Sequence, residues 1–322
     1  MKGHLVFVGH ISMDKVRNIH GERQQPGGAA LYAALAAKTL FPDVRIVSSV
    51  GKDFKYMDIL KNFSKCEVKL VDLPSTKFTI EYDDKWRAKY SKAVIGAGMQ
   101  IKVTSIPITW LTSNTIVHLC PMKPLKVEKM IDRIKRYSPK TKVSVNSWIG
   151  YMKNRVNREA LRRIASKVDF FIVNEREVKA ITRTDSLIHA INLIDCKMLV
   201  VTLGELGAIV STNGEVTMIP ALRTATQKVI DTTGAGDCWC GAFLAAYKLT
   251  EDISRAITTA SIISSIKCSG WGFEKLLKLK FNKVDDVAKY VLRMREKSVQ
   301  RVLTEFIEAK KTSSSNHFCL KV

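Results

Sequence analysis

Short apolar runs rich in β-branched residues alternate with longer stretches of helical periodicity along most of the chain. Strands that are buried on both faces read as continuous apolar runs, and such strands are typical of parallel sheets covered by helices. The alternation therefore predicts an α/β fold with a doubly wound, mostly parallel sheet flanked by helices. The expected strands lie within residues 4–9, 44–51, 115–120, 142–146, 169–174 and 198–204, and the expected helices span 28–40, 125–137, 157–166, 234–249, 254–267 and 283 to about 311.

The region from residue 66 to residue 93 breaks this rhythm, because KFTIEYDD and KWRAKY read as antiparallel strands joined by a tight turn. Together with roughly residues 11–25, it predicts a small β-sheet lid that excludes water from a reacting site. An ordinary edge hairpin without a gating role is the alternative. We expect a single domain over residues 1–311 and, where the periodicity is lost, a flexible tail over 312–322.

The composition is that of a globular protein, since 46% of the 322 residues are hydrophobic and 25% are charged. The HLVFVG run near the start is too short for a secretion signal, and no apolar run approaches the roughly 20 residues of a membrane span. The seven cysteines are scattered without CxxC spacing, which favours core thiols over disulfides or a zinc site. We expect a soluble, cytoplasmic protein.

Basic residues outnumber acidic ones by 52 to 30, which gives a formal net charge of +22. Such an excess attracts either nucleic acid or small anionic metabolites such as polyphosphates. The basic residues are spread along the whole chain, and neither zinc-finger spacing nor an aromatic RNA-binding signature accompanies them. We therefore interpret most of this charge as solvated surface and do not expect a nucleic-acid partner.

The strongest local signal is DTTGAGD, residues 231–237, which runs directly into the apolar helical pattern CWCGAFLAAYKL. Gly234 and Gly236 permit strained dihedrals and a close ligand approach, and the first turn of a helix has unpaired N–H groups aligned with its dipole. The amides of Gly234, Ala235 and Gly236 would therefore form an anion hole for a transferring phosphoryl group. Asp237 would accept the proton of an attacking hydroxyl. A simple capped helix start is the alternative.

DTTGAGD resembles the C-terminal signature of the ribokinase-like (pfkB) carbohydrate kinases, and PGGAALYAALAA, residues 26–37, resembles their N-terminal glycine-pair signature. Between them, NEREV (174–178) resembles the family's NxxE element, and VTLGELGA (201–208) resembles its nucleotide-binding strand and turn. The four elements occur in the family's order and bracket nearly the whole chain. The resemblance implies a ribokinase-like fold with a lid and ATP-dependent transfer of a γ-phosphate to an alcohol.

The resemblance also implies roles for individual residues. Asp237 would be the catalytic base, and Asn174 and Glu177 would organise Mg²⁺ against the phosphates of ATP. Asp231 and Thr233 sit where some relatives hold a monovalent cation such as K⁺. The nucleotide would be lined by Thr202, Gly204 and Gly207, and the acceptor would be bound by Asp14, Gly27, Gly28, Arg87 and Asn146.

Several of these residues have ordinary structural alternatives. Asp14 is also typical of a turn or cap after a strand, and Glu177 of an early-helix carboxylate that the helix dipole favours. Arg87 in an exposed hairpin is commonly just solvated. The chain lacks the Walker pattern GxxxxGK followed by Ser or Thr, and it lacks GxGxxG after its first strand.

The acceptor is the least defined part of the prediction. Many ribose and nucleoside relatives carry Asn where this chain has Tyr32, and the combination of GHISMD, GGAALY and the lid sequence is similar to archaeal-type sugar and polyol kinases, including those acting on myo-inositol. We therefore expect a sugar or polyol acceptor, with a nucleoside kinase as the first alternative and a non-catalytic binding module as the second. Some relatives pair through their lids, so a homodimer is also expected.

Overall fold

A computed structural model describes residues 3–221, 228–296 and 300. Within these residues, a nine-stranded sheet has the order β13-β12-β11-β10-β9-β8-β1-β4-β5, parallel from β11 to β5 and antiparallel at β12 and β13. The predicted α/β class with a mostly parallel sheet is confirmed. The strands are β1 (Leu5–Val8), β4 (Val44–Gly51), β5 (Lys65–Val71), β8 (Ile116–Leu119), β9 (Lys142–Asn146), β10 (Phe170–Asn174), β11 (Met198–Thr202), β12 (Gly207–Thr212) and β13 (Glu215–Pro220).

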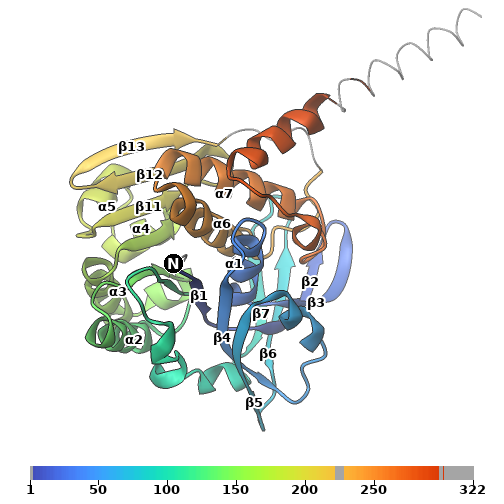
Figure 1. Ribbon diagram of the computed structural model, residues 1–322, viewed down its shortest axis with the longest axis horizontal. Helices are drawn as coiled ribbons and strands as arrows, with labels where there is room; N and C mark the ends of the chain where they lie inside the picture. Colours follow the sequence, from blue (N-terminus) through green and yellow to red (C-terminus); the bar gives the residue numbers. More distant parts are fainter. Residues whose placement is uncertain (1–2, 222–227, 297–299, 301–322) are drawn as a thin grey trace, which may run out of the picture.

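Helices cover both faces of this sheet (Figure 1). Helices α1, α6 and α7 pack on one face with Phe7 and Ile172, while α2, α3, α4 and α5 pack on the other with Val8 and Val173. Neighbouring residues of one strand thus enter opposite cores, as the period-2 geometry of a strand requires. The helices are α1 (Ala29–Lys38), α2 (Pro124–Tyr137), α3 (Arg155–Lys167), α4 (Glu175–Thr182), α5 (Leu187–Asn192), α6 (Ala235–Thr250) and α7 (Ile253–Cys268).

The remaining helical segments are short or terminal. Residues 285–296 are helical, and the expected continuation to residue 311, like the tail over 312–322, lies outside the described residues. No helix in the described part of the chain has both the length and the apolar character to cross a bilayer. Single 3₁₀ turns lie at Met57–Asn62, Gly96–Gln100, Val103–Ser105, Ile108–Trp110, Ile149–Lys153, Gly204–Leu206 and Leu276–Lys278.

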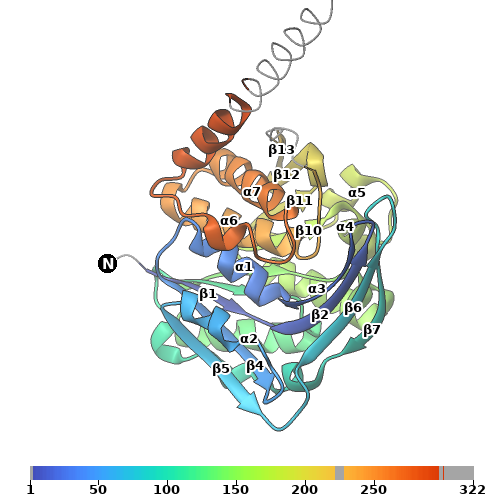
Figure 2. The ribbon, with the colours of Figure 1, turned by 90° about the vertical axis from the view of Figure 1, so that its right-hand side faces the viewer.

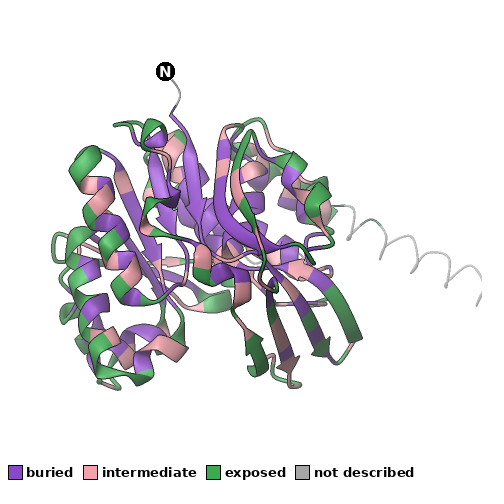
Figure 3. Cartoon of the chain, turned by 90° about the horizontal axis from the view of Figure 1, so that it is seen from below, coloured by how far each residue is buried: buried purple, intermediate pink, exposed green. Residues whose placement is uncertain are grey.

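A separate four-stranded sheet has the order β3-β2-β6-β7 and lies beside the main domain (Figure 2). Its strands are β2 (Ser12–Asn18), β3 (Gly21–Gly27), β6 (Thr76–Tyr82) and β7 (Ala88–Val94). Residues 66–71, which the sequence pattern places in the lid, instead belong to β5 and pair with β4 in the large sheet. Figure 3 shows that buried residues concentrate in the central layers. Strand β7 of the small sheet is instead exposed along most of its length.

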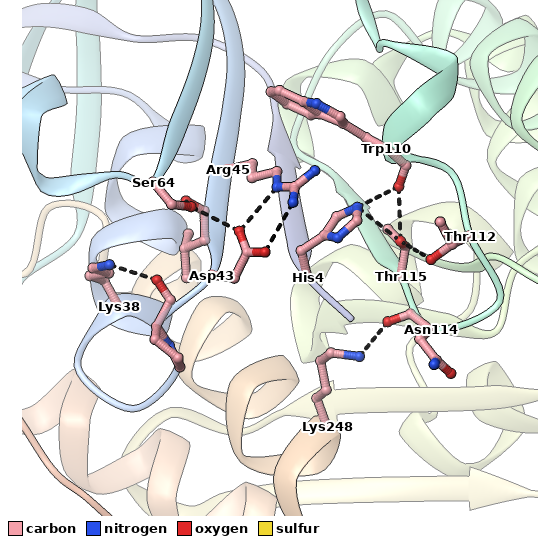
Figure 4. Close-up of polar contacts among 12 residues, drawn as sticks. His4, Lys38, Asp43, Arg45, Ser64, Trp110, Thr112, Asn114, Thr115 and Lys248 are labelled. Atoms are coloured by element: carbon pink, nitrogen blue, oxygen red, sulfur yellow. Dashed lines mark hydrogen bonds and ion pairs between the residues drawn. The ribbon is translucent and has the colours of Figure 1, made fainter. Parts of the chain in front are cut away.

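A polar cluster ties together the amino ends of the central strands (Figure 4). Asp43 accepts two hydrogen bonds of 3.0 Å from the guanidinium of Arg45 and one of 2.8 Å from Ser64 Oγ. Partial burial alone would raise the pKa of Asp43, but these donors hold it below its usual value. Beside them, His4 Nε2 lies 2.6 Å from the carbonyl oxygen of Trp110. This cluster fixes the strand ends opposite to those discussed next.

Candidate active site

The carboxyl ends of three neighbouring parallel strands bring together predicted site residues. Asn146 ends β9, Asn174 ends β10 and Thr202 ends β11. Asn174 and Thr202 are register partners, and Asn146 is the partner of Ile172, two residues before Asn174. Ligands of open α/β sheets bind outside this edge of the strands. The strand ends therefore define where a ligand is expected.

The glycine turn of DTTGAGD leads directly into α6. Gly234 has φ 71°, and a Cβ on it would clash with the ring of Tyr32, so both its backbone and its surroundings require glycine. A Cβ on Gly236 would meet no atom within 4 Å, so open space lies in front of this residue. The Ala235 amide donates to the Thr232 carbonyl at 3.1 Å, whereas the Gly234 and Gly236 amides have no acceptor among the described residues. Of the three predicted anion-hole amides, two are thus unengaged.

Asp237 lies in the first turn of α6, where the helix dipole favours a carboxylate. Its Oδ1 accepts a 3.0 Å hydrogen bond from Asn146 Nδ2. Burial raises the pKa of Asp237 to about 6, and the hydrogen bond from Asn146 opposes that rise. A carboxyl with a pKa near 6 is still largely ionised at neutral pH and is a stronger base than an ordinary aspartate. The structure therefore joins two of the predicted site residues directly.

Asn174 and Glu177 form a capping box at the start of α4. The Asn174 side chain accepts from the Glu177 amide at 2.9 Å, and Glu177 Oε2 accepts from the Asn174 amide at 3.0 Å. The early-helix explanation for Glu177 thus describes part of what the side chain does. Burial raises the pKa of Glu177 to about 7, and the charge of Asp237 contributes to that rise. The two carboxylates therefore lie close enough to influence each other.

The buried carboxylate of Glu177 fits a magnesium ion of the kind that accompanies phosphates. Mg²⁺ prefers oxygen ligands, keeps several waters and is commonly bound through one or two carboxylates together with phosphates. Glu177 would hold such an ion, with Asn174 beside it at the start of α4, and the ion would stabilise the Glu177 carboxylate, whose pKa is raised by burial and by the charge of Asp237. No group of three or more acidic, His or Cys side chains in the described ranges has metal-binding geometry by itself.

The predicted nucleotide turn follows β11 on the same edge of the sheet. Gly204 has φ 62° and open space around its Cα, so a ligand can approach its backbone closely. Gly207 has φ 114°, and a Cβ on it would clash with the Ile219 carbonyl oxygen across the β12–β13 pair. Gly207 is thus explained by the fold of the hairpin itself, while Gly204 is left open to a ligand.

Asp14, Gly27 and Gly28 come together where the small sheet joins the main domain. A Cβ on Gly27 would clash with the Asp14 carboxylate, and a Cβ on Gly28 would clash with the carbonyl oxygen of His10. Asp14 is almost fully buried on β2, and burial raises its pKa to about 7. Its Oδ1 has no hydrogen-bond partner among the described residues. A buried acceptor in this condition is suited to an incoming hydroxyl group.

Asp231 contacts a buried lysine, whereas the family resemblance implied a monovalent cation beside it. Its carboxylate accepts hydrogen bonds from the side chain of Gln25 and from the amides of Thr233 and Gly272, at 2.8–3.0 Å. The ammonium of Lys267 lies 2.8 Å from the Asp231 carbonyl oxygen and 3.4 Å from Oδ2, and both side chains are fully buried. Burial alone would raise the pKa of Asp231, but Lys267 and the hydrogen bonds hold it below its usual value. Lys267, which the sequence analysis missed, thus provides the positive charge there.

Arg87 is not brought to the other predicted residues. Its guanidinium bonds Asp83 at 2.6 Å within the turn between β6 and β7, and its side chain is 67% exposed. Asp83, four residues away, thus gives the Arg87 guanidinium a hydrogen-bond partner without any ligand. The structure thus favours the solvated alternative for Arg87 over the predicted contact with the acceptor.

Aromatic rings instead link the small sheet to the main domain. The ring of Tyr90 on β7 lies 5.8 Å from that of Trp148, which in turn lies 5.5 Å from that of Tyr151. Burial raises the pKa of the Tyr90 phenol, and the charges of Tyr82, Asp237 and Asp14 add to the effect. Tyr90 and Trp148 are nevertheless 44% and 38% exposed. These rings form an accessible aromatic surface near the acids.

Comparison with known proteins agrees with this architecture. Residues 3–279 match the pfkB family carbohydrate kinase pattern. The chain is 30% identical over 261 residues to a cytidine kinase of Thermococcus kodakarensis, covering 79% of this chain and 91% of that one. It is 27% identical over 290 residues to a nucleoside kinase of Methanocaldococcus jannaschii, covering 82% and 91%. A ribokinase structure from Giardia lamblia superposes with a TM-score of 0.74 at 20% identity, covering 91% and 100%.

The family pattern spans both the central sheet and the small sheet, and it includes the glycine turn and the capping box. The relatives that match along most of the chain are named as kinases. The predicted membership is therefore confirmed, and so is the predicted enzyme class, a phosphotransferase with an alcohol acceptor. This chain belongs to the pfkB family of carbohydrate kinases.

Proposed function

We propose that this chain is a nucleoside kinase that transfers the γ-phosphate of ATP to a hydroxyl group of a nucleoside. The observation that carries the transfer is the position of Asp237, a carboxyl with a pKa of about 6 next to the unengaged amides of Gly234 and Gly236. The carboxylate can take the proton of the acceptor hydroxyl, and the two amides can stabilise the phosphoryl oxygens.

In this mechanism the protein residues bind and orient the two substrates and accept one proton. They form no covalent intermediate. Asp14 accepts a hydrogen bond from the acceptor through its unpartnered oxygen. Asp237 removes the proton of the attacking hydroxyl, and the oxygen that is formed attacks the γ-phosphorus in line as the bond to ADP breaks. Glu177, with Asn174, would hold Mg²⁺, which would neutralise phosphate charge. Gly204 allows the nucleotide to approach the end of β11.

Two observations support a nucleoside as the acceptor. Tyr90 and Trp148 offer accessible rings near Asp14 and Asp237, and a nucleobase stacks favourably on such rings. The relatives from Thermococcus kodakarensis and Methanocaldococcus jannaschii are named as cytidine and nucleoside kinases. A free sugar or polyol, such as a hexose or an inositol, is the second candidate, because the unpartnered oxygen of Asp14 suits any hydroxyl-rich acceptor.

The test is ATP consumption with Mg²⁺ over a panel of cytidine, uridine, adenosine, inosine, ribose, glucose and myo-inositol. We expect the highest kcat/KM with a nucleoside. Turnover with myo-inositol or a hexose and none with nucleosides would support the second candidate instead. No turnover with any hydroxyl compound would contradict the kinase proposal for this site.

A pair of tryptophan variants tests the aromatic surface. Trp148→Ala is expected to raise KM for the nucleoside roughly tenfold, since base stacking contributes about 1–3 kcal/mol, and to leave KM for ATP unchanged. Trp271→Ala is the matched control, because Trp271 packs under the guanidinium of Arg23 rather than against Tyr90. Equal effects of the two variants would argue against base stacking on Trp148.

A further inference from the structure

Adjacent strands β8 and β9 place three polar side chains in a row behind Asp237. His118 on β8 is the register partner of Ser144 on β9, and Asn146 lies two residues further along β9. Side chains two residues apart on a strand share a face, so Ser144 and Asn146 both lie on the face of His118. The ring of Phe7 on β1 contacts His118 edge-on at 5.7 Å and belongs to the core that includes α6. The row therefore points toward the helix that carries Asp237.

Two buried atoms in this row have no hydrogen-bond partner among the described residues. His118 Nδ1 lies 3.0 Å from Ser144 Oγ, and Asn146 Nδ2 donates to Asp237 Oδ1 at 3.0 Å. His118 Nε2 and Asn146 Oδ1 are both buried and have no partner at good geometry among the described residues. Burial lowers the pKa of His118 to about 3, and interaction with the Asn146 side chain opposes this. The two unpartnered atoms thus belong to side chains that face each other.

The tautomer of the neutral imidazole decides whether His118 Nε2 can donate a hydrogen bond to Asn146 Oδ1. A neutral histidine carries one proton, so one ring nitrogen donates and the other accepts. If Nδ1 accepts from the Ser144 hydroxyl, Nε2 carries the proton and can donate to Asn146 Oδ1. In the opposite tautomer, the Nε2 lone pair would face Asn146 Oδ1, and both buried acceptors would remain unsatisfied, which is unfavourable. The amide would then turn its oxygen toward the Asp237 carboxylate.

We propose that His118 is a positioning residue for Asp237, because its Nε2–H fixes the Asn146 amide with Nδ2 toward the carboxylate. This inference rests on the proposed role of Asp237 as the base. The row occupies Asp237 Oδ1 and leaves Oδ2 to take the proton of the acceptor. It extends the set of residues that orient Asp237 to β8, the strand that pairs with β9.

The direct test reads the tautomer without any turnover. In protein labelled with ¹⁵N-histidine, we expect His118 Nε2 to show a one-bond coupling to its proton and Nδ1 to show none at neutral pH. His118→Gln assigns the signal by removing it. A proton on Nδ1, or a doubly protonated ring, would overturn the proposal even if the protein phosphorylated no acceptor tested.

The kinetic test separates positioning from packing. His118→Leu is expected to lower kcat roughly tenfold without a matching change in KM for ATP, because the Asn146 amide is no longer held in the orientation that donates to the charged carboxylate of Asp237. Its acidic pH limb should move to higher pH, because Asp237 loses the fixed donor. His118→Gln, whose side-chain amide retains a donor near Nε2, should recover most of kcat and the original limb.

Phe7→Leu is the packing control, since it alters the same core face without a polar group. If His118→Leu changes kcat and the pH limb no more than Phe7→Leu does, the proposal is wrong. Other titratable groups that face Asp237 are present in all these variants, so they do not distinguish them. These groups are Glu177 on α4, Tyr90 on β7, Cys120 after β8, and Cys238 and Cys240 on α6.

Discussion

Asn146, the last residue of β9, donates a 3.0 Å hydrogen bond to Asp237, which lies 91 positions later at the start of α6. This bond joins the edge of the parallel sheet to the glycine turn, so that the fold itself sets the direction of the carboxylate. The end of β9 and the start of α6 are far apart in the sequence, yet they form one site.

Asp237→Asn is expected to lower kcat by about 10²–10⁴-fold, because an amide cannot accept the proton of the hydroxyl. The variant should keep the fold and ATP binding, since the side chain retains its size. Measurement of single-turnover rates and of ATP binding by calorimetry checks both parts. A rate within a factor of three of the unaltered enzyme would remove Asp237 from the role of base.

The pH dependence of the rate follows from the same carboxylate. The base acts when deprotonated, and its pKa is about 6, so kcat/KM should be flat above pH 7 and fall as the pH drops through 6. Glu177, with a pKa of about 7, interacts with Asp237, so the acidic limb belongs to the pair. A limb centred near pH 4 would show that neither carboxyl is perturbed in the working enzyme.

Stability should change with pH in the opposite sense from that of paired surface carboxylates. Asp14, Glu177 and Asp237 have folded-state pKa values raised above their unfolded values, so the folded protein binds more protons between about pH 4 and pH 7. Their contribution to stability is therefore present at low pH and is lost as the pH rises through 6–7. Asp237→Asn should raise Tm at pH 8 relative to the unaltered protein and should narrow that difference at pH 5. An equal difference at both pH values would contradict the raised pKa.

Much of the fold could be predicted from the sequence, because the α/β alternation is a local pattern. The expected helices at 28–40, 125–137 and 234–249 differ by at most two residues at either end from α1, α2 and α6. Helices α4 and α5 were missed, since eight and six residues hold too few turns to show a period. Residues 66–71 are predicted in the wrong sheet, because strand composition does not specify which neighbour a strand pairs with.

The site was predictable where one motif holds several of its residues. DTTGAGD carries the glycine turn and Asp237 together, so their proximity is local. The partner of Asp231 is 36 positions away on α7, and a lone lysine in an apolar helix indicates only that some counter-charge exists. Arg87 looked like a ligand contact, because its local partner Asp83 is recognisable only once the turn between β6 and β7 is known.

A pair of glycine variants separates folding from catalysis. Gly234→Ala is expected to destabilise the protein by at least about 1 kcal/mol, because alanine is strained at φ 71° and its Cβ clashes with Tyr32. The methyl group of Gly236→Ala meets no atom within 4 Å and φ of Gly236 is not positive, so this variant should unfold at the same or a slightly higher denaturant concentration than the unaltered protein. It should nevertheless lower kcat, since its methyl group enters the space where phosphate oxygens are expected. Normal turnover in Gly236→Ala would argue against an anion site at this turn.

The buried ammonium of Lys267 predicts that turnover does not depend on potassium. It already neutralises Asp231 and lies 5.2 Å from the ring centre of Tyr32, which packs against Gly234. Rates in potassium, sodium and choline chloride at equal ionic strength should therefore agree, and strong activation by K⁺ would show that a further cation is needed.

Lys267→Met should cost about 3–5 kcal/mol of unfolding free energy, because it leaves the Asp231 charge buried and unpaired. The double variant Lys267→Met with Asp231→Asn should lose less stability than Lys267→Met alone, since the unpaired charge is gone. If the double variant is instead the less stable of the two, the ammonium acts through packing rather than through its charge.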